Sequence, residues 1–351
     1  MSTHKPKDVV LLCNPQAGGR WRALADVLDS EEAKSVRRIV TDEIKDVREA
    51  LVSVGQRPKL VCIYGGDGTI YHVINEMLRN QELLRNQSPG EPLPRLALLG
   101  GGTMNVTGRM CGMVASPGEN FRSIMRAYLT DKLLWREVPV MEITSGEQRS
   151  YGFTFGMGPL VRLLDRYESG NKGKLAALGL GLRAIAAAVS PVRTSMSDLF
   201  EDMQGSVFAD GSELPYHHFT AVFANTTGAI NRAIEPFTDP RTRETFHFLA
   251  YAVSSREFAM LTPLLARGKL PFDRSELWNP LAAWRLLSSM ASGKGPLPRD
   301  PRYVNHPAQH LRVEASESIY TIDGEVLQAS GAPLEVKLGP SLQLALRDAD
   351  P

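Results

Sequence analysis

The chain has 351 residues, of which 43% are hydrophobic and 23% are charged, as in a folded globular protein. Its length favours two domains over one. The formal net charge of +1 gives no argument for nucleic-acid binding, so we expect no nucleic-acid partner. No apolar stretch reaches the ~18 residues of a membrane span, and the N-terminus lacks the apolar core of a signal peptide. We therefore expect a cytoplasmic protein in which Cys13, Cys62 and Cys111 are buried, reduced thiols.

Strands alternate with helices through the first third of the chain. Expected strands cover 8–13, 36–41, 60–64 and 95–99, and the helices between them include 21–28, 43–54 and 70–78. This alternation predicts a parallel sheet with right-handed crossovers between its strands. We place this α/β domain at residues 1–135.

The pattern changes after residue 135, where strand-like segments follow one another without regular helices between them. They cover 138–144, 151–155, 219–224, 246–253, 311–313, 318–322 and 334–337. Two helical insertions are expected at about 172–189 and 255–267, and a loop at 291–301. Residues 136–351 therefore form a second, β-rich domain.

Three glycine-containing turns follow strands of the first domain. They are Asn14-Pro15-x-x-Gly18, Gly65-Gly66-Asp67-Gly68-Thr69, and a turn that ends in Gly102-Thr103-x-Asn105. In parallel sheets ligands bind beyond the carboxyl ends of the strands, so the three turns are expected to meet at one edge. Glycine turns bring backbone amides close to an anion such as a phosphate. Asp67 is an unexpected residue in such a cradle unless a metal ion or a proton transfer requires it.

Together with Asp323-Gly324-Glu325 near the C-terminus, these turns resemble the diacylglycerol kinase catalytic-domain family. That family includes bacterial lipid kinases and the sphingosine and ceramide kinases, with NAD kinases as more distant relatives. The resemblance implies an α/β nucleotide-binding domain with a parallel sheet and a C-terminal antiparallel β-sandwich with helical insertions. It places the active site in the cleft between the two domains.

The resemblance also implies roles for individual residues. Asp67 matches the general base, or a magnesium-linked carboxylate that acts through water, and Glu325 matches an acid that reaches the cleft from the second domain. The positions that match nucleotide contacts are Asn14, Thr41, Gly65, Gly66, Gly68, Thr69, Gly102, Thr103, Asn105 and Asp323. The alternative is that Asp67 stabilises a turn and that Asp323-Gly324 is a simple hairpin turn.

Three positions depart from the family pattern. Val106 and Leu160 stand where many members have Asp, and His72 stands where many have Glu. The changes at Val106 and Leu160 concern the acceptor side of the site and leave the identity of the lipid open. Arg162 and Arg166 match positions that contact phosphate in sphingosine-type members, and a solvated helix face explains them equally well.

The segment from Lys172 to Val189 is an apolar helix pattern with basic flanks. It either packs in the core of the second domain or lies on an anionic membrane or along a lipid tunnel.

The predicted function is an ATP- and Mg²⁺-dependent lipid kinase. It would transfer the γ-phosphoryl group to diacylglycerol or to a ceramide- or sphingoid-type lipid at the inner membrane face. The sequence leaves open whether the protein forms a homodimer. The alternatives are a soluble-substrate kinase related to the NAD kinases and a non-catalytic protein that binds nucleotide or lipid.

Overall fold

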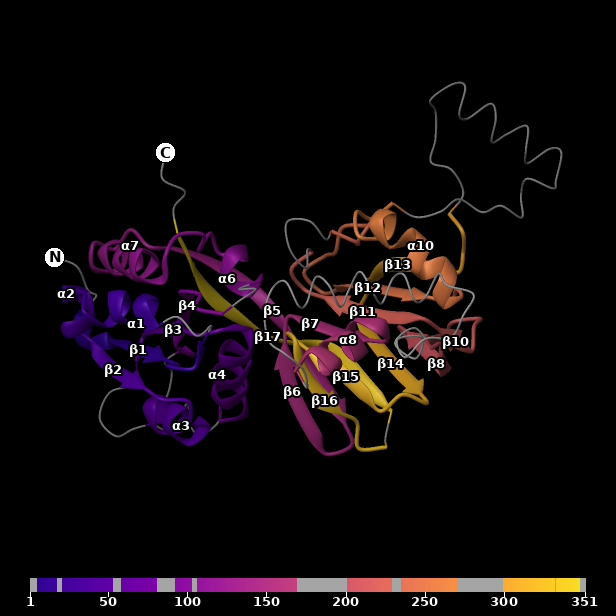
Figure 1. Ribbon diagram of the computed structural model, residues 1–351, viewed down its shortest axis with the longest axis horizontal. Coiled ribbons are helices and arrows are strands. Elements are labelled where there is room, and N and C mark those ends of the chain that lie inside the picture. The colour runs from indigo at the N-terminus through magenta and orange to yellow at the C-terminus, as the bar shows by residue number, and fades with distance from the viewer. Residues whose placement is uncertain are drawn as a thin grey trace, which may run out of the picture.

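The protein forms two lobes joined by long strands (Figure 1). In this computed structural model the described residues are 5–17, 21–52, 58–80, 92–102, 106–168, 201–228, 235–269, 299–331 and 333–347. The helix expected at 172–189 lies outside these ranges, as do residues 291–298 of the loop expected at 291–301 and Gly18, Thr103 and Asn105.

The N-terminal lobe contains the expected parallel sheet. Its strands lie in the order β2-β1-β3-β4 and are all parallel. They are β1 (Val9–Cys13), β2 (Arg37–Val40), β3 (Leu60–Tyr64) and β4 (Arg95–Leu98). Every residue of β1 and β3 is buried, as expected for apolar strands covered on both faces.

Helices cover the two faces of this sheet in pairs. The helices described in this lobe are α1 (Trp21–Leu28), α2 (Glu31–Lys34), α3 (Ile44–Val52), α4 (Asp67–Arg79), α6 (Val106–Met110) and α7 (Pro117–Leu129). Helix α1 packs on α7, and α3 packs on α4. Figure 1 shows these two pairs above and below the strands. The alternation of strands and helices expected from the sequence is confirmed.

Two long antiparallel strands extend the same sheet into the second lobe. They are β5 (Leu134–Ser145) and β17 (Leu334–Leu346). Near its end β17 pairs in parallel with β4, at Leu344 and Leu96, and its beginning pairs with β14 (His310–Ala315). The sheet continues through β8 (Met203–Ala209) and β10 (His218–Phe219), while β6 (Gln148–Gly152) and β9 (Ser212–Glu213) pair at its side.

The length of β17 differs from the expectation of a strand over 334–337. Gly339 and Pro340 resemble a strand end in the sequence, but the chain passes them through a shift in register between Leu338 and Ser341. The last strand therefore returns to the N-terminal sheet and ties the end of the chain to β4.

A second sheet of six strands packs against the extended half of the first. All its pairings are antiparallel, in the order β13-β12-β11-β7-β15-β16. Its strands are β7 (Thr154–Met157), β11 (Ala221–Asn225), β12 (Phe246–Tyr251), β13 (Tyr303–Ala308), β15 (Ile319–Ile322) and β16 (Glu325–Gln328). Side chains of both sheets, such as Val336 and Leu311 from one and Phe248 and Ile322 from the other, share one core. The second lobe is thus a β-sandwich, as expected.

Two strands expected to be continuous are each divided between the sheets. Residues 151–155 contain the end of β6 and the start of β7, with Phe153 between them. Residues 219–224 contain the end of β10 and the start of β11, with Thr220 between them. The prediction of single strands was wrong because the chain changes sheets inside an apolar run, which hydrophobic periodicity does not mark.

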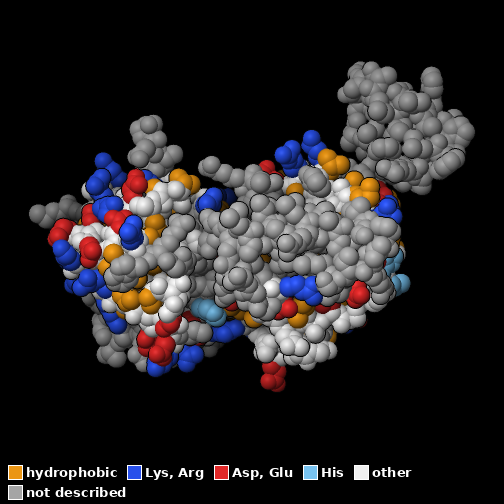
Figure 2. Space-filling model, in the orientation of Figure 1, with side chains coloured by type: hydrophobic (Ala, Val, Ile, Leu, Met, Phe, Trp, Pro, Cys, Tyr) orange, Lys and Arg blue, Asp and Glu red, His pale blue; other side chains and the backbone are white. Residues whose placement is uncertain are grey.

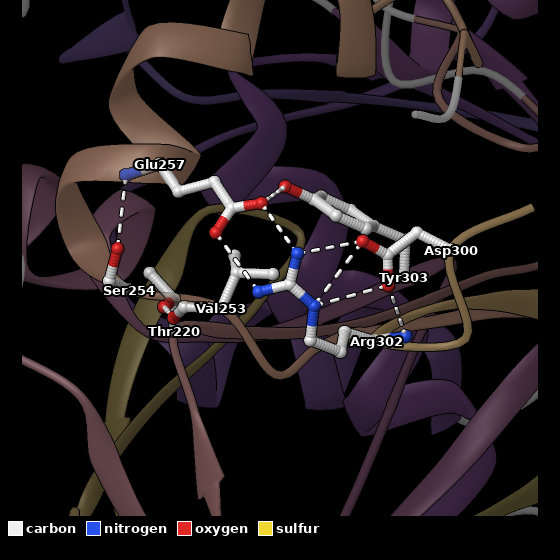
Figure 3. A network of polar contacts seen from close by, with 7 residues as sticks. All are labelled: Thr220, Val253, Ser254, Glu257, Asp300, Arg302 and Tyr303. Atoms are coloured by element: carbon white, nitrogen blue, oxygen red, sulfur yellow. Dashed lines mark hydrogen bonds and ion pairs between the residues drawn. The ribbon is translucent and has the colours of Figure 1, made fainter. Parts of the chain in front are cut away.

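The outer face of the second sheet carries α10 (Ser255–Leu265), whose Leu265 is buried with Phe223 and Tyr251. A polar network joins this helix to β13 (Figure 3). Arg302 lies 2.9 Å from Glu257 Oε1 and 2.7 Å from Asp300 Oδ2, and the Tyr303 hydroxyl donates to Glu257 at 2.9 Å. Burial and Glu257 raise the pKa of Tyr303, so this phenol stays a hydrogen-bond donor.

The surface carries charges of both signs, as the net charge near zero suggests, and the cysteines are buried as expected. Lys and Arg side chains alternate with Asp and Glu over the N-terminal lobe on the face drawn in Figure 2. Cys13, Cys62 and Cys111 are buried and free, and burial raises the pKa of each thiol. Among the helices that the structure describes, none is long and apolar enough to cross a membrane.

Candidate active site

The central turn, Gly65–Thr69, connects β3 to α4. Gly66 is the N-cap of α4, with φ −82° and ψ −178°, and no side chain caps the helix there. The helix begins at Asp67 with the positive end of its dipole at the turn. Backbone amides at such a position attract an anionic group, provided that no bulky side chain covers them.

The glycine turns after β3 and β4 lie against each other. A Cβ added to Gly66 would stand 3.3 Å from the Gly102 Cα, and one added to Gly101 would stand 3.1 Å from the Gly65 nitrogen. A Cβ at Gly65 would overlap Thr69, at 2.4 Å from its Cβ. Glycine is therefore needed on both sides for the two turns to approach this closely. The expected meeting of these turns at one sheet edge is confirmed.

The first turn joins the same edge through Asn14. Its side-chain Nδ2 donates to Thr69 Oγ1 at 2.9 Å, and its backbone N–H donates to the Tyr64 carbonyl at 2.9 Å. Asn14 Oδ1 accepts from the Gln16 N–H at 2.8 Å. Asn14 therefore links the ends of β1 and β3 and holds the Thr69 hydroxyl in place.

Thr41 lies beside this turn, since its N–H donates to the Cys13 carbonyl at the end of β1. Its hydroxyl donates to Asp46 Oδ2 at 2.7 Å and accepts from the Glu43 N–H at 2.9 Å. The hydroxyl thus organises the turn before α3. A nucleotide contact by Thr41 stays a prediction.

Asp67 is the first residue of α4, and its carboxylate contacts the neighbouring glycine segment. Oδ1 accepts from the Thr107 N–H at 3.3 Å and from the Thr107 hydroxyl at 3.4 Å. Thr107 is buried, with 7% of its surface exposed. Thr107 was not predicted as a site residue, and the available signal was its position two residues after Asn105, which ends the third glycine turn.

Glu325 comes from the second sheet and meets the start of α4. It is the first residue of β16, and its Oε1 lies 2.1 Å from the position that a Cβ on Gly68 would occupy. The acid expected to cross from the second lobe is therefore placed against the central turn, one residue from Asp67.

Asp323 is held by backbone amides at the corner between β6 and β7. Its Oδ1 accepts from the Thr154 N–H at 2.8 Å and from the Phe153 N–H at 3.0 Å, and Oδ2 also accepts from Phe153 at 3.0 Å. Its own N–H donates to the Thr154 carbonyl at 3.0 Å, and its φ of 52° is left-handed. Asp323 therefore anchors the hairpin that carries Glu325. A nucleotide contact by Asp323 stays a prediction.

The charge of Asp67 acts on the carboxyl groups of both Asp323 and Glu325. Burial raises the pKa of Asp323 to about 7, and the charge of Asp67 adds to this rise, while the Phe153 and Thr154 amides oppose it. Burial, followed by the charge of Asp67, also raises the pKa of Glu325. Asp323 and Glu325 therefore take up protons more readily than ordinary carboxyl groups. A cation bound nearby would favour their ionised forms.

Carboxylate oxygens suit Mg²⁺, which usually keeps several waters and binds one or two carboxylates together with substrate phosphates. Among the described residues, no three acidic, His or Cys side chains converge as a metal site. A water-mediated contact between Asp67 and a Mg²⁺ ion stays a prediction.

The remaining sequence candidates lie in different surroundings. His72 is half-buried beside Tyr71, with ring centroids 5.2 Å apart, and burial followed by Arg79 lowers its pKa. Arg162, in α8 (Pro159–Glu168), donates to Glu317 at 2.7 and 3.0 Å and to the Glu201 carbonyl at 2.5 Å. Arg162 is thus already engaged in a bidentate ion pair. Arg166 lies in the last turn of α8. Val106 and Leu160 lie at the starts of α6 and α8, and their side chains are not among those that the structure describes.

Part of the chain matches a known protein family. Residues 8–132 match the family model described as the diacylglycerol kinase catalytic domain. The resemblance read from the motifs is confirmed. Among curated proteins, none matches the chain.

Solved structures show a likeness in fold over nearly the whole chain. A proposed diacylglycerol kinase from Bacillus anthracis aligns with a TM-score of 0.62 at 19% identity, covering 99% of each chain. A structure titled as a diacylglycerol kinase from the same organism aligns at 0.56 and 16% identity, again covering 99% of each. An NAD kinase from Archaeoglobus fulgidus in complex with ATP aligns at 0.46 and 10% identity, covering 97% of this chain and 94% of that one. The two Bacillus structures share the two-lobed fold described above.

Proposed function

We propose that this protein is a lipid kinase that transfers the γ-phosphoryl group of ATP to a lipid hydroxyl. The observation that carries the proposal is the approach of Glu325, from the second lobe, to Gly68, the residue after Asp67 at the start of the glycine-turn helix. The match of residues 8–132 to the diacylglycerol kinase catalytic domain supports the reaction class. Diacylglycerol is the proposed acceptor, with a ceramide or sphingoid base as the near alternative.

Phosphoryl transfer is catalysed mainly by positioning and by stabilisation of charge on the phosphate oxygens. Gly65, Gly66 and Gly68 keep side chains away from the first amides of α4, where the nucleotide phosphates would bind. Asn14 fixes the Thr69 hydroxyl beside them. A Mg²⁺ ion, when bound, would neutralise part of the phosphate charge.

Asp67 is proposed to accept the proton of the attacking hydroxyl. Thr107 donates to Oδ1 and thereby orients the carboxylate. Burial and the charge of Asp67 raise the pKa of both Asp323 and Glu325, so two groups that readily bind protons lie beside the proposed base. Glu325 would face the acceptor from the second lobe. Since a membrane lipid is the proposed acceptor, we also propose peripheral contact with the cytoplasmic face of the membrane.

The test is transfer of radiolabelled γ-phosphate from ATP with Mg²⁺ into mixed micelles. The micelles would contain diacylglycerol, ceramide or sphingosine, and NAD would be tested as a soluble acceptor. We expect labelled lipid with the wild-type protein and a loss on the order of 10²-fold or more with Asp67→Asn, because removal of a general base typically costs this much. Equal labelling by both proteins would remove Asp67 from catalysis.

If NAD is the only acceptor that becomes labelled, the protein is a kinase of a soluble substrate and the lipid kinase proposal is wrong. ATP binding by calorimetry without transfer to any acceptor would favour a non-catalytic nucleotide-binding protein. Thr107→Val serves as a graded variant, since it removes the hydroxyl donor while keeping the N–H that also contacts Asp67. Its activity should fall between those of the wild type and Asp67→Asn.

A further inference from the structure

A buried amide side chain lies in the middle of the helix that begins with Asp67. Asn75 is 2% exposed, on a helix whose other buried residues include Ile74 and Met77. Its side chain makes three hydrogen bonds. Nδ2 donates to the Tyr151 carbonyl at 2.8 Å and to the Tyr71 carbonyl at 2.9 Å, while Oδ1 accepts from the Tyr151 N–H at 2.9 Å. Asn75 thus pairs with both backbone groups of Tyr151, as a neighbouring strand would.

The residue that Asn75 binds leads directly to the anchor of Glu325. Tyr151 is followed by Gly152 at the end of β6, and the next two amides, those of Phe153 and Thr154, donate to Asp323. Asp323 is in turn two residues from Glu325, which contacts the turn at Gly68. A continuous path therefore starts at Asp67, passes through α4 and Asn75 into β6 and the Asp323 corner, and returns through Glu325 to the first turn of α4.

We propose that Asn75 is a positioning residue that fixes Asp67 relative to Glu325. The inference rests on the proposed kinase function, because it concerns the geometry on which phosphoryl transfer would depend. Apolar packing between a helix and a strand tolerates small sliding movements, whereas a two-way hydrogen bond to one backbone residue allows a single register. Catalysis is sensitive to displacements of about 1 Å between reacting groups.

The other contacts between α4 and β6 are weaker guides to register. The Tyr71 hydroxyl donates to Ser150 Oγ at 3.3 Å, and the exposed Arg79 donates to the Arg149 carbonyl at 2.8 Å. Both involve long side chains that can follow a shifted partner. Asn75 has a short side chain and lies between them, so it determines the alignment most directly.

The test compares Asn75→Leu with Asn305→Leu. Leucine is close to asparagine in size but cannot pair with a backbone. Asn305 is similarly buried, at 6% exposure, and similarly bound to backbone, donating to the Pro236 carbonyl at 2.7 Å and accepting from the Thr238 N–H at 3.2 Å. It lies on β13, separated from β15 by β12, β11 and β7. The readouts are kcat, the calorimetric Kd for ATP, melting temperature and amide hydrogen exchange.

We expect Asn75→Leu to lower kcat about tenfold or more and to change the Kd for ATP by less than about threefold. Amide exchange at 151–154 should rise by about tenfold or more. Asn305→Leu should lower the melting temperature comparably with kcat unchanged. The proposal is overturned if the two variants lose kcat equally at equal melting temperature, or if exchange at 151–154 does not change in Asn75→Leu.

Asn75→Asp keeps the acceptor for the Tyr151 N–H and loses the donor, so it covers the case in which the leucine variant does not fold. Its kcat and its exchange at 151–154 should lie between those of the wild type and a full loss, and wild-type values for both would overturn the proposal. Exchange is independent of activity. If the wild type transfers no phosphate to any acceptor, the proposed kinase function is wrong, whatever the exchange shows. If amide exchange at 151–154 is unchanged in the Asn75 variants, the positioning role of Asn75 is wrong, whatever the activity.

Discussion

The Glu325 carboxylate lies directly against the backbone of Gly68. A Cβ on Gly68 would stand 2.1 Å from Glu325 Oε1 and 3.1 Å from Glu325 Cδ, so a side chain and the acid cannot both occupy this space. Gly68 lies within the first turn of α4 and has no left-handed φ that would require glycine. The close approach of Glu325, rather than backbone conformation, therefore accounts for glycine at this position.

Gly68→Ala should separate activity from stability. Alanine is favoured over glycine in a helix by about 1 kcal/mol, and the atom it meets is the far end of a flexible side chain. We expect the free energy of unfolding in urea to stay within about 1 kcal/mol of wild type, while lipid phosphorylation falls on the order of tenfold or more. In an Glu325→Ala background the same change should have no further effect on activity, because the displaced group is absent. A fully active Gly68→Ala protein would show that the position of Glu325 is unimportant.

Asp67→Asn should change the titration of its neighbours. The negative charge of Asp67 contributes to the raised pKa of both Asp323 and Glu325. Neutralising it removes a repulsion that disfavours their ionised forms, so both pKa values should fall. Carboxyl ¹³C NMR across pH 3 to 9 would measure the shift. The Asp323 midpoint should stay above the usual value of an aspartate because burial is the larger cause. Unchanged midpoints would mean that Asp67 does not act on these groups.

Much of the arrangement of the glycine turns was predictable because the sequence signals for it are local. Each glycine turn follows an apolar strand, and the topology of a parallel sheet brings the ends of such strands together. The contact of Gly66 with Gly102 and the bond from Asn14 to Thr69 follow from that arrangement. Asp67 was singled out because an acidic residue is unexpected in a glycine turn that would bind phosphate.

Long-range arrangements were harder to predict. The two-way pairing of Asn75 with Tyr151 joins residues 76 positions apart, and no local pattern in either segment marks it. Asp323 was assigned to nucleotide binding from its motif, while its carboxylate is engaged by amides from a corner that the sequence analysis had read as one strand. The Asp323 contacts depend on the change of sheet at Phe153, which hydrophobic periodicity does not encode.

Asp323 should make stability depend on pH. Its pKa rises from an ordinary value of 3.8 to about 7 in the folded protein. The folded state therefore binds more protons than the unfolded state between these values, and the contribution to stability is full below about pH 4 and is lost as pH rises to 7. Asp323→Asn keeps an oxygen for the Phe153 and Thr154 amides but does not titrate. The free energy of unfolding of the wild type, relative to this variant, should fall on the order of a few kcal/mol over that range. A constant difference from pH 4 to 7 would contradict the raised pKa.

Arg302 should matter for stability and not for catalysis. It joins Glu257 of α10 to Asp300, whose side chain is only 10% exposed, in the turn before β13, the edge strand farthest from β16. Arg302→Met leaves two carboxylates without their partner, and we expect the free energy of unfolding to drop by about 1–3 kcal/mol because an unpaired, partly buried charge is costly. The matched control is Arg299→Met, which breaks a more exposed pair with Asp239 at 3.2 Å and should cost less than about 1 kcal/mol. Urea unfolding of both variants, with kinase assays in parallel, tests the difference. Equal costs for the two changes would show that the network in Figure 3 contributes no more than an ordinary surface ion pair.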